Sequence, residues 1–144
     1  MIVVKLAGGM GNQMFQYALG KLNSIKYNKK LILDLSFLLD RNQGPNFTYR
    51  NYDLDIFKLE VETVNSIDVN DSFIRIEEPG HHFPNPQFTE IYNHVPTDKN
   101  LYISGYFQKD IYVKYLRDTL LKDFQLKDLL DKKAQTLLEK IKKE

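Results

Sequence analysis

Short apolar runs and a longer helical period alternate along the first part of the chain. The run Ile2-Val3-Val4-Lys5-Leu6, within residues 2–7, is typical of a buried strand. A second run of the same kind occupies residues 30–35. Between them, apolar residues recur at helical spacing from Asn12 to about Tyr27, at Phe15, Ala18, Leu22 and Ile25. The pattern predicts a strand–helix–strand unit, whose two strands must be parallel.

The middle of the chain predicts fewer regular elements. Residues 36–60 mix aromatic and charged side chains without a clear period, and 42–46 have the composition of a loop. Residues 72–77 alternate as a strand with one solvent-exposed face, and 101–107 read as a third convincing strand. Residues 78–100 hold four of the five prolines and all three histidines. This composition predicts a long loop, of the kind that often serves as a lid or binding loop.

Two helices are predicted at the end of the chain. The first covers 109–124 and carries Ile111, Tyr115 and Leu120 on its apolar side. The second covers 126–143 and has lysines and acids opposite an apolar stripe, which is typical of a helix packed on the domain surface. The stripe consists of Leu126, Leu129, Leu130, Ala134, Leu137, Leu138 and Ile141. The interspersed acids argue against membrane binding by its lysines. The whole pattern predicts an α/β fold, a Rossmann-like lobe with a mostly parallel sheet.

Composition narrows the class of protein. With 144 residues the chain is expected to be one domain, and a net charge of +1 argues against nucleic acid as a partner. The absence of cysteine excludes disulfides, a thiolate nucleophile and cysteine-based zinc sites. No stretch approaches the ~20 apolar residues of a membrane span, and the N-terminal run is too short for a signal peptide. We therefore expect a cytoplasmic protein, with peripheral membrane association of the full-length protein left open.

The most informative segment is the glycine turn, residues 8–13 (GGMGNQ), between the first strand and the first helix. Backbone N–H groups at a helix N-terminus point outward, and the helix dipole adds roughly half a positive charge there. Glycines allow positive φ angles and a close approach of ligand to backbone. The turn would lie at the carboxyl edge of the sheet, where open α/β sheets bind ligands. It therefore predicts a site for a phosphorylated or sugar-like ligand.

Several interpretations of this turn compete. A P-loop is excluded, because no Gly-Lys-Ser/Thr follows. A dinucleotide-binding fingerprint almost fits, with Asp34 about where a ribose-binding acid would lie, but Met14 stands at the third glycine position. A turn that serves backbone geometry alone is also open. Asn12 has an equally simple explanation as the N-cap of the helix.

Three ordered motifs carry a resemblance to a known family. Residues 8–20 (GGMGNQMFQYALG) closely resemble the N-terminal signature of glycosyltransferase family 11, the α-1,2-fucosyltransferases, with Met10 in place of the usual leucine. Residues 50–54 (RNYDL) are similar to the family's R-x-Y-x-L segment, and 105–108 (GYFQ) to its G-Y-[FW]-Q segment. Lys109 stands where a serine is usual. The matches span nearly the whole chain and imply the N-terminal lobe of a two-lobed enzyme of the GT-B type.

The family's second signature, His-x-Arg-Arg-Gly-Asp, is implied to bind the diphosphate of GDP-fucose and would follow a helix like 126–143. That signature is absent from these 144 residues. We therefore expect residues 1–144 to form a single N-terminal, acceptor-side lobe without the C-terminal donor-binding lobe, as a fragment, a split protein or a trimmed chain. The isolated chain is then expected to be inactive.

The resemblance implies an inverting transfer of fucose from GDP-fucose to the 2-hydroxyl of a galactoside, with a galactose-bearing glycan as acceptor and no metal or other cofactor. It places Asn12 nearest the chemistry. Neutral amides suit this role because they orient hydroxyl and phosphate groups without adding charge. The implied substrate-binding residues are Gly8, Gly9, Gly11, Asn12, Gln13, Tyr106 and Gln108.

A general base is not identified by the sequence. Asp34, Asp53 and Asp55 are candidates only because they lie near predicted strand ends or loops. The pair His81-His82 does not predict a metal site, because adjacent side chains point apart and no third ligand is placed by spacing. Two other functions stay open: a dinucleotide-binding oxidoreductase lobe and a non-catalytic module that binds a glycan.

Overall fold

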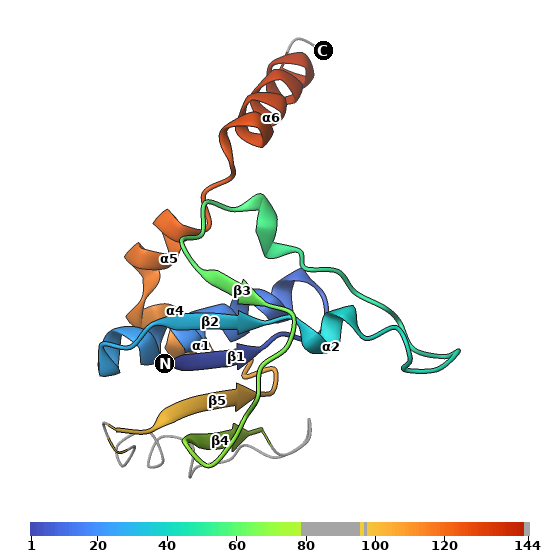
Figure 1. Ribbon diagram of the computed structural model, residues 1–144. Coiled ribbons are helices and arrows are strands. Elements are labelled where there is room, and N and C mark those ends of the chain that lie inside the picture. Colours follow the sequence, from blue (N-terminus) through green and yellow to red (C-terminus); the bar gives the residue numbers. More distant parts are fainter. Residues whose placement is uncertain (79–95, 97, 143–144) are drawn as a thin grey trace.

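The computed structural model describes residues 1–78, 96 and 98–142, with only the backbone for 128–131. In these residues one sheet has the order β3-β2-β1-β5-β4, and every pairing is parallel (Figure 1). Its strands are β1 (Ile2–Lys5), β2 (Leu31–Asp34), β3 (Glu62–Val64), β4 (Phe73–Glu77) and β5 (Asn100–Ser104). The helices are α1 (Met10–Tyr27), α2 (Ser36–Leu39), the 3-10 turn η1 (Leu54–Ile56), α4 (Asp110–Tyr115), α5 (Arg117–Asp123) and α6 (Asp128–Ile141). The predicted Rossmann-like α/β fold is confirmed.

β1 is the central strand, and the order of the sheet reverses there. It pairs with β2 on one side and with β5 on the other, and the predicted β1–α1–β2 unit is confirmed. Where the strand order reverses, the chain connections that follow two neighbouring strands run to opposite sides. A crevice therefore opens at the carboxyl ends of these strands. The glycine turn follows β1 directly and therefore lies at this point.

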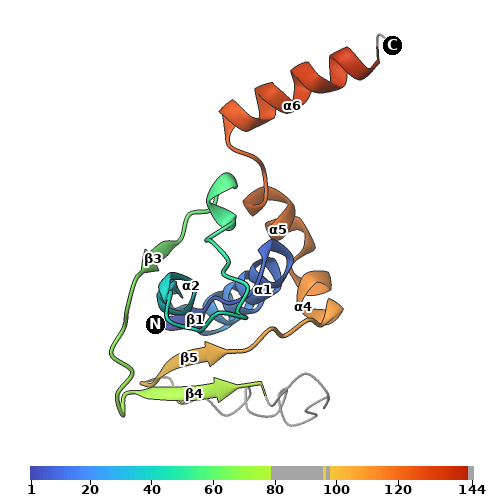
Figure 2. The ribbon, with the colours of Figure 1, turned by 90° about the vertical axis from the view of Figure 1, so that its right-hand side faces the viewer.

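The two faces of the sheet bury different amounts of apolar surface. Successive side chains of a strand point to opposite faces, so Ile2 and Val4 enter the larger core and Val3 enters the smaller one. Figure 2 shows α1, α4 and α5 on the same side of the sheet. The larger core lies on that side and includes Tyr17 of α1 and Tyr112 of α4.

The buried face of α1 is partly polar, and it includes Ala18 and Leu22 but not Ile25 of the apolar positions that predicted the helix. Gln13, Gln16 and Asn23 are buried together with Tyr17 and Leu19, whereas Ile25 is 54% exposed. A Cβ at Gly20 would collide with the side chains of Val4 and Leu31, so this helix packs closely on the sheet. The glutamines are buried because they bind backbone groups, as described below.

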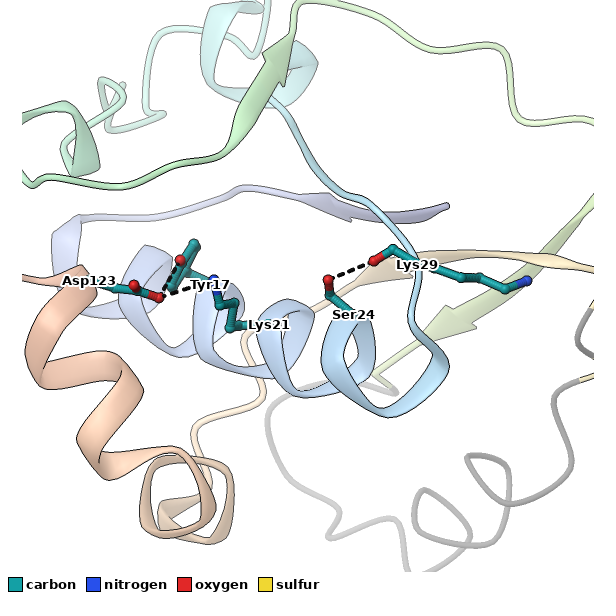
Figure 3. Close-up of polar contacts among 5 residues, drawn as sticks. All are labelled: Tyr17, Lys21, Ser24, Lys29 and Asp123. Atoms are coloured by element: carbon teal, nitrogen blue, oxygen red, sulfur yellow. Dashed lines mark hydrogen bonds and ion pairs between the residues drawn. The ribbon is translucent and has the colours of Figure 1, made fainter.

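A buried tyrosine links α1 to α5. The Tyr17 hydroxyl donates a hydrogen bond to Oδ2 of Asp123 over 2.7 Å, and Lys21 Nζ lies 3.4 Å from the same oxygen (Figure 3). Farther along α1, the Ser24 hydroxyl donates to the carbonyl of Lys29 over 2.6 Å. The contacts of Asp123 fix the middle of α1 to α5, and the bond of Ser24 fixes the last turns of α1 to the segment that leads into β2.

The single helix predicted over 109–124 is wrong. The segment forms α4 and α5, separated at Leu116, where φ is −113° and ψ is 13°. Tyr112, Leu116 and Leu120 are buried, whereas the predicted apolar residues Ile111 and Tyr115 are 42% and 74% exposed. Tyr112, Leu116 and Leu120 are spaced four residues apart, so the buried side chains follow one helical face across the bend at Leu116.

The prediction that the last helix packs on the domain surface is also wrong. α6 projects away from the rest of the molecule (Figure 1), and every side chain described from 132 to 142 is exposed. The peptide before it is fixed, because Lys58 N donates to the carbonyl of Gln125 over 2.8 Å and Lys127 N donates to that of Ile56 over 3.0 Å. A periodic stripe shows which face a helix can bury, but not whether a partner for that face is present.

The predictions for the middle of the chain have different outcomes. α2 lies in the stretch 36–60, which has no clear period, and β3 lies just after it, where the sequence predicted no element. The strand at 72–77 is confirmed as β4, with Ile76 buried and Arg75 exposed. Most of the predicted loop over 78–100, with its histidines, lies outside the described residues. Among the residues that are described, no helix is long and apolar enough to cross a membrane.

Candidate functional site

A cleft opens at the carboxyl edge of the sheet, directly over the glycine turn. We call it the glycine-turn cleft, and its volume is about 270 Å³. Residues from the glycine turn, α1, α2, the 47–50 segment and the loop after β5 surround it. They are Gly8, Gly9, Asn12, Phe37, Leu38, Phe47, Thr48, Arg50 and Tyr106. Four of the predicted site residues thus meet in one hollow: Gly8, Gly9, Asn12 and Tyr106.

The shape of this cleft depends on Gly8. Its φ of +76° lies in the left-handed region, and a Cβ there would overlap the Asn12 side chain and approach the Tyr106 ring to 2.9 Å. Gly9 follows with φ −79° and ψ 179° and is the N-cap of α1. Asn12 therefore lies inside the first turn, and its alternative interpretation as the N-cap is wrong. Without a capping role, its side chain is available to the cleft.

The Asn12 side chain is hydrogen-bonded to Gln108. Nε2 of Gln108 donates to Oδ1 of Asn12 over 2.5 Å, although Gln108 itself is exposed and comes from the loop after β5. The two predicted residues, 96 positions apart in sequence, are therefore neighbours in space. This bond orients the Asn12 amide, which leaves its nitrogen to act as a donor.

Gln13 is fully buried, and its amide is bound to backbone groups. Nε2 donates to the carbonyls of Gly8 and Asn51 over 2.9 and 2.8 Å, and Oε1 accepts from Asp53 N over 2.9 Å. The side chain joins the glycine turn to the 51–53 segment. The structure thus gives this amide a supporting role. Its direct contact with a substrate stays a prediction.

Gln16 performs the same task one helical turn later. Its Oε1 accepts from Ala7 N over 3.1 Å, and its Nε2 donates to the carbonyl of Gly105 over 2.8 Å. It is fully buried and connects the segments that follow β1 and β5. The sequence does not indicate that Gln16 is buried, because it is a polar residue between the aromatic residues Phe15 and Tyr17.

The electrostatics of the cleft favour an anion. Arg50 lies in its wall beside the N-terminus of α1, where backbone N–H groups and the helix dipole also attract negative charge. A second hollow of about 190 Å³ shares Phe37 and Tyr106 with the first and adds Lys5. None of the described residues that line these two hollows is an aspartate or glutamate. The site therefore offers positive charge and amide hydrogen bonds.

The candidate acids lie elsewhere. Asp34 is buried, with Oδ1 accepting from Ser36 N over 2.8 Å and Oδ2 accepting from the Tyr102 hydroxyl over 2.7 Å. Its carboxylate holds these two neighbours in place and is not presented to a ribose, which argues against the dinucleotide interpretation. Neither Asp53 nor Asp55 lines the described cleft, so no general base is assigned there.

Gly11 lies away from the glycine-turn cleft. It borders an apolar groove between α1 and the α4–α5 pair, which is lined by Gly11, Met14, Phe15, Ala18, Val113, Arg117, Leu120, Leu121 and Phe124. Its contact with a substrate stays a prediction.

The sequence identifies Arg50 only as part of a motif, and it does not single out Phe37 or Phe47, because their segments carry no periodic signal. Among the described residues, no group of three His, Asp or Glu side chains could hold a metal ion.

Comparison with known proteins points to enzymes that build glycans. The chain is 36% identical over 85 residues to an α-1,2-colitosyltransferase of Escherichia coli, which covers 58% of this chain and 24% of the relative. It is 30% identical over 149 aligned positions to an O-antigen biosynthesis glycosyltransferase, WbnK, also of Escherichia coli, which covers 88% of this chain and 49% of the relative. No family model and no solved structure matches.

Both of these relatives are glycosyltransferases, and this chain is similar to part of each. It spans about half of the second relative and about a quarter of the first. The longer match includes most of the residues that form the sheet and the glycine-turn cleft.

Proposed function

We propose that this chain is one lobe of a glycan-synthesising glycosyltransferase and that the glycine-turn cleft is its wall of the active site. The observation that carries the proposal is the convergence of Gly8, Asn12 and Arg50 at the N-terminus of α1. A sugar nucleotide presents a diphosphate and hydroxyl groups, which suit a cation, backbone N–H groups and a neutral amide. The similarity to two glycosyltransferases supports the same class.

Within that class, we propose transfer of fucose from GDP-fucose to the 2-hydroxyl of a galactoside, as the family 11 motifs imply. The acceptor oxygen forms a bond to the anomeric carbon while the bond from that carbon to GDP breaks, with inversion, and the hydroxyl proton passes to a base. Arg50 would stabilise negative charge on the departing GDP, and Asn12 would orient the sugar. The proposed arrangement places the chain as the N-terminal, acceptor-side lobe of a GT-B enzyme.

A second donor is favoured by the first relative. Its name gives it an α-1,2 linkage, the linkage that the family 11 motifs imply, with colitose as the transferred sugar. A direct comparison of a fucose donor with a colitose donor separates the two specificities.

Ligand titration of the purified chain, followed by nuclear magnetic resonance, tests the proposal. GDP and GDP-fucose should bind weakly, because the signature implied to hold the diphosphate is not among these residues, and they should shift the amide signals of Gly8, Gly9 and Asn12. Arg50→Gln should weaken this binding further, by on the order of tenfold. Arg75→Gln is the matched control, since Arg75 lies on β4 and its Nη2 donates to the carbonyl of Val69. Saturable binding of NAD(H) without any response to GDP-fucose would instead favour the oxidoreductase alternative.

In this proposal, transferase activity also needs a part of the enzyme that corresponds to the half of WbnK outside the match with this chain. We expect little or no turnover of GDP-fucose by the 144 residues alone. Adding the uncovered part of WbnK in trans should give fucosyl transfer that depends on Asn12. Binding of a galactose-bearing glycan without turnover under those conditions would favour the non-catalytic glycan-binding module.

A further inference from the structure

Glu78, which directly follows β4, holds the loop that carries Tyr106 and Gln108. Its Oε2 accepts hydrogen bonds from the backbone nitrogens of Tyr106 and Phe107, over 2.8 and 3.0 Å. Its own backbone nitrogen donates to the carbonyl of Ser104 over 2.9 Å, which continues the pairing of β4 with β5. One carboxylate thus accepts from two successive N–H groups of the loop.

The loop adopts a conformation that needs such support. Gly105 has φ +150° and Phe107 has φ +50°, and a non-glycine residue rarely occupies the left-handed region unless its surroundings hold it there. The Phe107 ring is buried, and a Cβ at Gly105 would collide with the Glu78 side chain and that ring. Glu78 and the Phe107 ring therefore occupy the space on one side of this turn.

The turn is held on its other side by Gln16, which donates to the carbonyl of Gly105 over 2.8 Å. The loop between these two supports projects Tyr106 into both hollows of the site and brings Gln108 onto Asn12. Glu78 itself lines neither hollow. Its carboxylate acts on the site only through the backbone of residues 106 and 107.

We propose that Glu78 is a positioning residue, whose carboxylate sets the orientation of Tyr106 and thereby the affinity of the site for an acceptor glycan. This inference rests on the proposed function. We assign Tyr106 to the acceptor side of the cleft and the glycine turn with Arg50 to the diphosphate. Among the described residues, neither the glycine turn nor Arg50 is hydrogen-bonded or ion-paired to Glu78, so the diphosphate should not depend on this carboxylate. The proposal therefore separates the two ligands: acceptor affinity depends on Glu78, and GDP affinity does not.

Three variants of the chain test the role. Glu78→Ala removes both hydrogen bonds, Glu78→Gln keeps a side-chain oxygen that can still accept them, and Glu77→Gln removes the same charge from the exposed neighbouring position. We expect Glu78→Ala to weaken binding of a galactose-bearing glycan by on the order of tenfold and to change GDP binding by less than about twofold. Glu78→Gln should restore most of the affinity, and Glu77→Gln should match the wild type.

Amide hydrogen exchange gives a readout that does not depend on any ligand. The Tyr106 and Phe107 amides should exchange at least about tenfold faster in Glu78→Ala than in the wild type, because each loses its acceptor. Unchanged exchange at both amides overturns the positioning role. Equal loss of glycan and GDP affinity overturns the separation between the two ligands. If wild-type protein binds neither ligand, the proposed function fails, and the exchange rates still decide whether Glu78 holds the loop.

Discussion

The side chain of Gln108 donates a hydrogen bond to Asn12, and this contact joins the loop after β5 to the first turn of α1. The donor and acceptor atoms lie 2.5 Å apart, and Asn12 itself lines the glycine-turn cleft. We predict a coupling free energy of about 0.5–1.5 kcal/mol between Asn12→Ala and Gln108→Ala in a double-mutant cycle of urea unfolding. Pairing Asn12→Ala with Gln43→Ala, whose side chain contacts Asp40, is the control and should give additive changes.

Gly8 and Gly9 are adjacent but differ in what a side chain would meet. Gly8→Ala should lower the free energy of unfolding by about 1–3 kcal/mol, because φ is +76° and the new Cβ collides with Asn12 and Tyr106. Gly9→Ala is the matched control, since φ is −79° and nothing lies within 4 Å of its Cβ position. Chemical denaturation of both variants measures the difference. Equal stability would show that the turn tolerates a side chain at position 8.

The buried glutamines should be intolerant of apolar replacement. Gln16→Leu leaves the Ala7 N–H and the Gly105 carbonyl without their side-chain partner, which we expect to cost about 2–4 kcal/mol of unfolding free energy. Gln43→Leu, at an exposed position, should change the stability by less than about 0.5 kcal/mol. The measurement is urea denaturation followed by circular dichroism. A stable Gln16→Leu protein would contradict the supporting role of this amide.

Stability should fall at alkaline pH. Burial raises the pKa of Tyr112 from its ordinary value of 10.0 to about 12, with a further contribution from the charge of Glu78. Burial also raises the pKa of Tyr17, together with its bond to Asp123. Because the unfolded chain then loses protons first, the folded state loses stability as pH rises above about 10, and the part due to Tyr112 is lost between about 10 and 12.

The alkaline prediction is checked by urea denaturation across this pH range. The unfolding free energy of Tyr112→Phe should fall less steeply with pH than that of the wild type, because the variant lacks the buried hydroxyl that titrates. Tyr115→Phe is the control, because that side chain is 74% exposed, and its slope should equal that of the wild type. Identical slopes in all three proteins would mean that Tyr112 does not carry this pH dependence.

Removal of α6 should leave the body of the domain intact. A chain that ends at Lys127 loses a helix whose described side chains are exposed, so its unfolding free energy should change by less than about 0.5 kcal/mol. Phe124→Ala should cost about 2–4 kcal/mol, because this ring packs on Tyr17 and Phe57 with centroid separations of 5.4 and 5.2 Å. Thermal unfolding of both proteins separates the two contributions. A large loss on shortening would reveal a contact of α6 with the domain.

The sequence predicted the central part of the fold because its signals there are local. Apolar runs at 2–7 and 30–35 with a helical period between them left a parallel pair as the simplest arrangement, and β1, α1 and β2 confirm it. β3 was missed because Glu62–Val64 is short and presents two exposed side chains out of three. The break at Leu116 was missed because residues on both sides of it keep a helical period.

The candidate site was predicted in part for the same reason. The glycine turn and Asn12 stand in one continuous segment, so their proximity follows from the chain itself. Arg50 and Phe37 reach the cleft through tertiary contacts, which no local period reports. The roles of Gln13 and Gln16 also depend on backbone groups of distant segments, namely residues 51, 53 and 105. The sequence alone does not show that these two glutamines are buried, because their backbone partners belong to segments far away along the chain.

The partners of Gln13 and Gln16 are backbone atoms, so these bonds do not depend on the chemistry of the partner side chains. Gln13 binds main-chain groups of Asn51 and Asp53, whatever side chains those two positions carry. Gln16 binds the carbonyl of Gly105, a position where a side chain would collide with Glu78 and Phe107. Exchanges of side chains at 51 and 53 therefore need not loosen α1 from the loops. Substitutions at these two positions can accumulate while the helix that anchors the segment keeps its contacts.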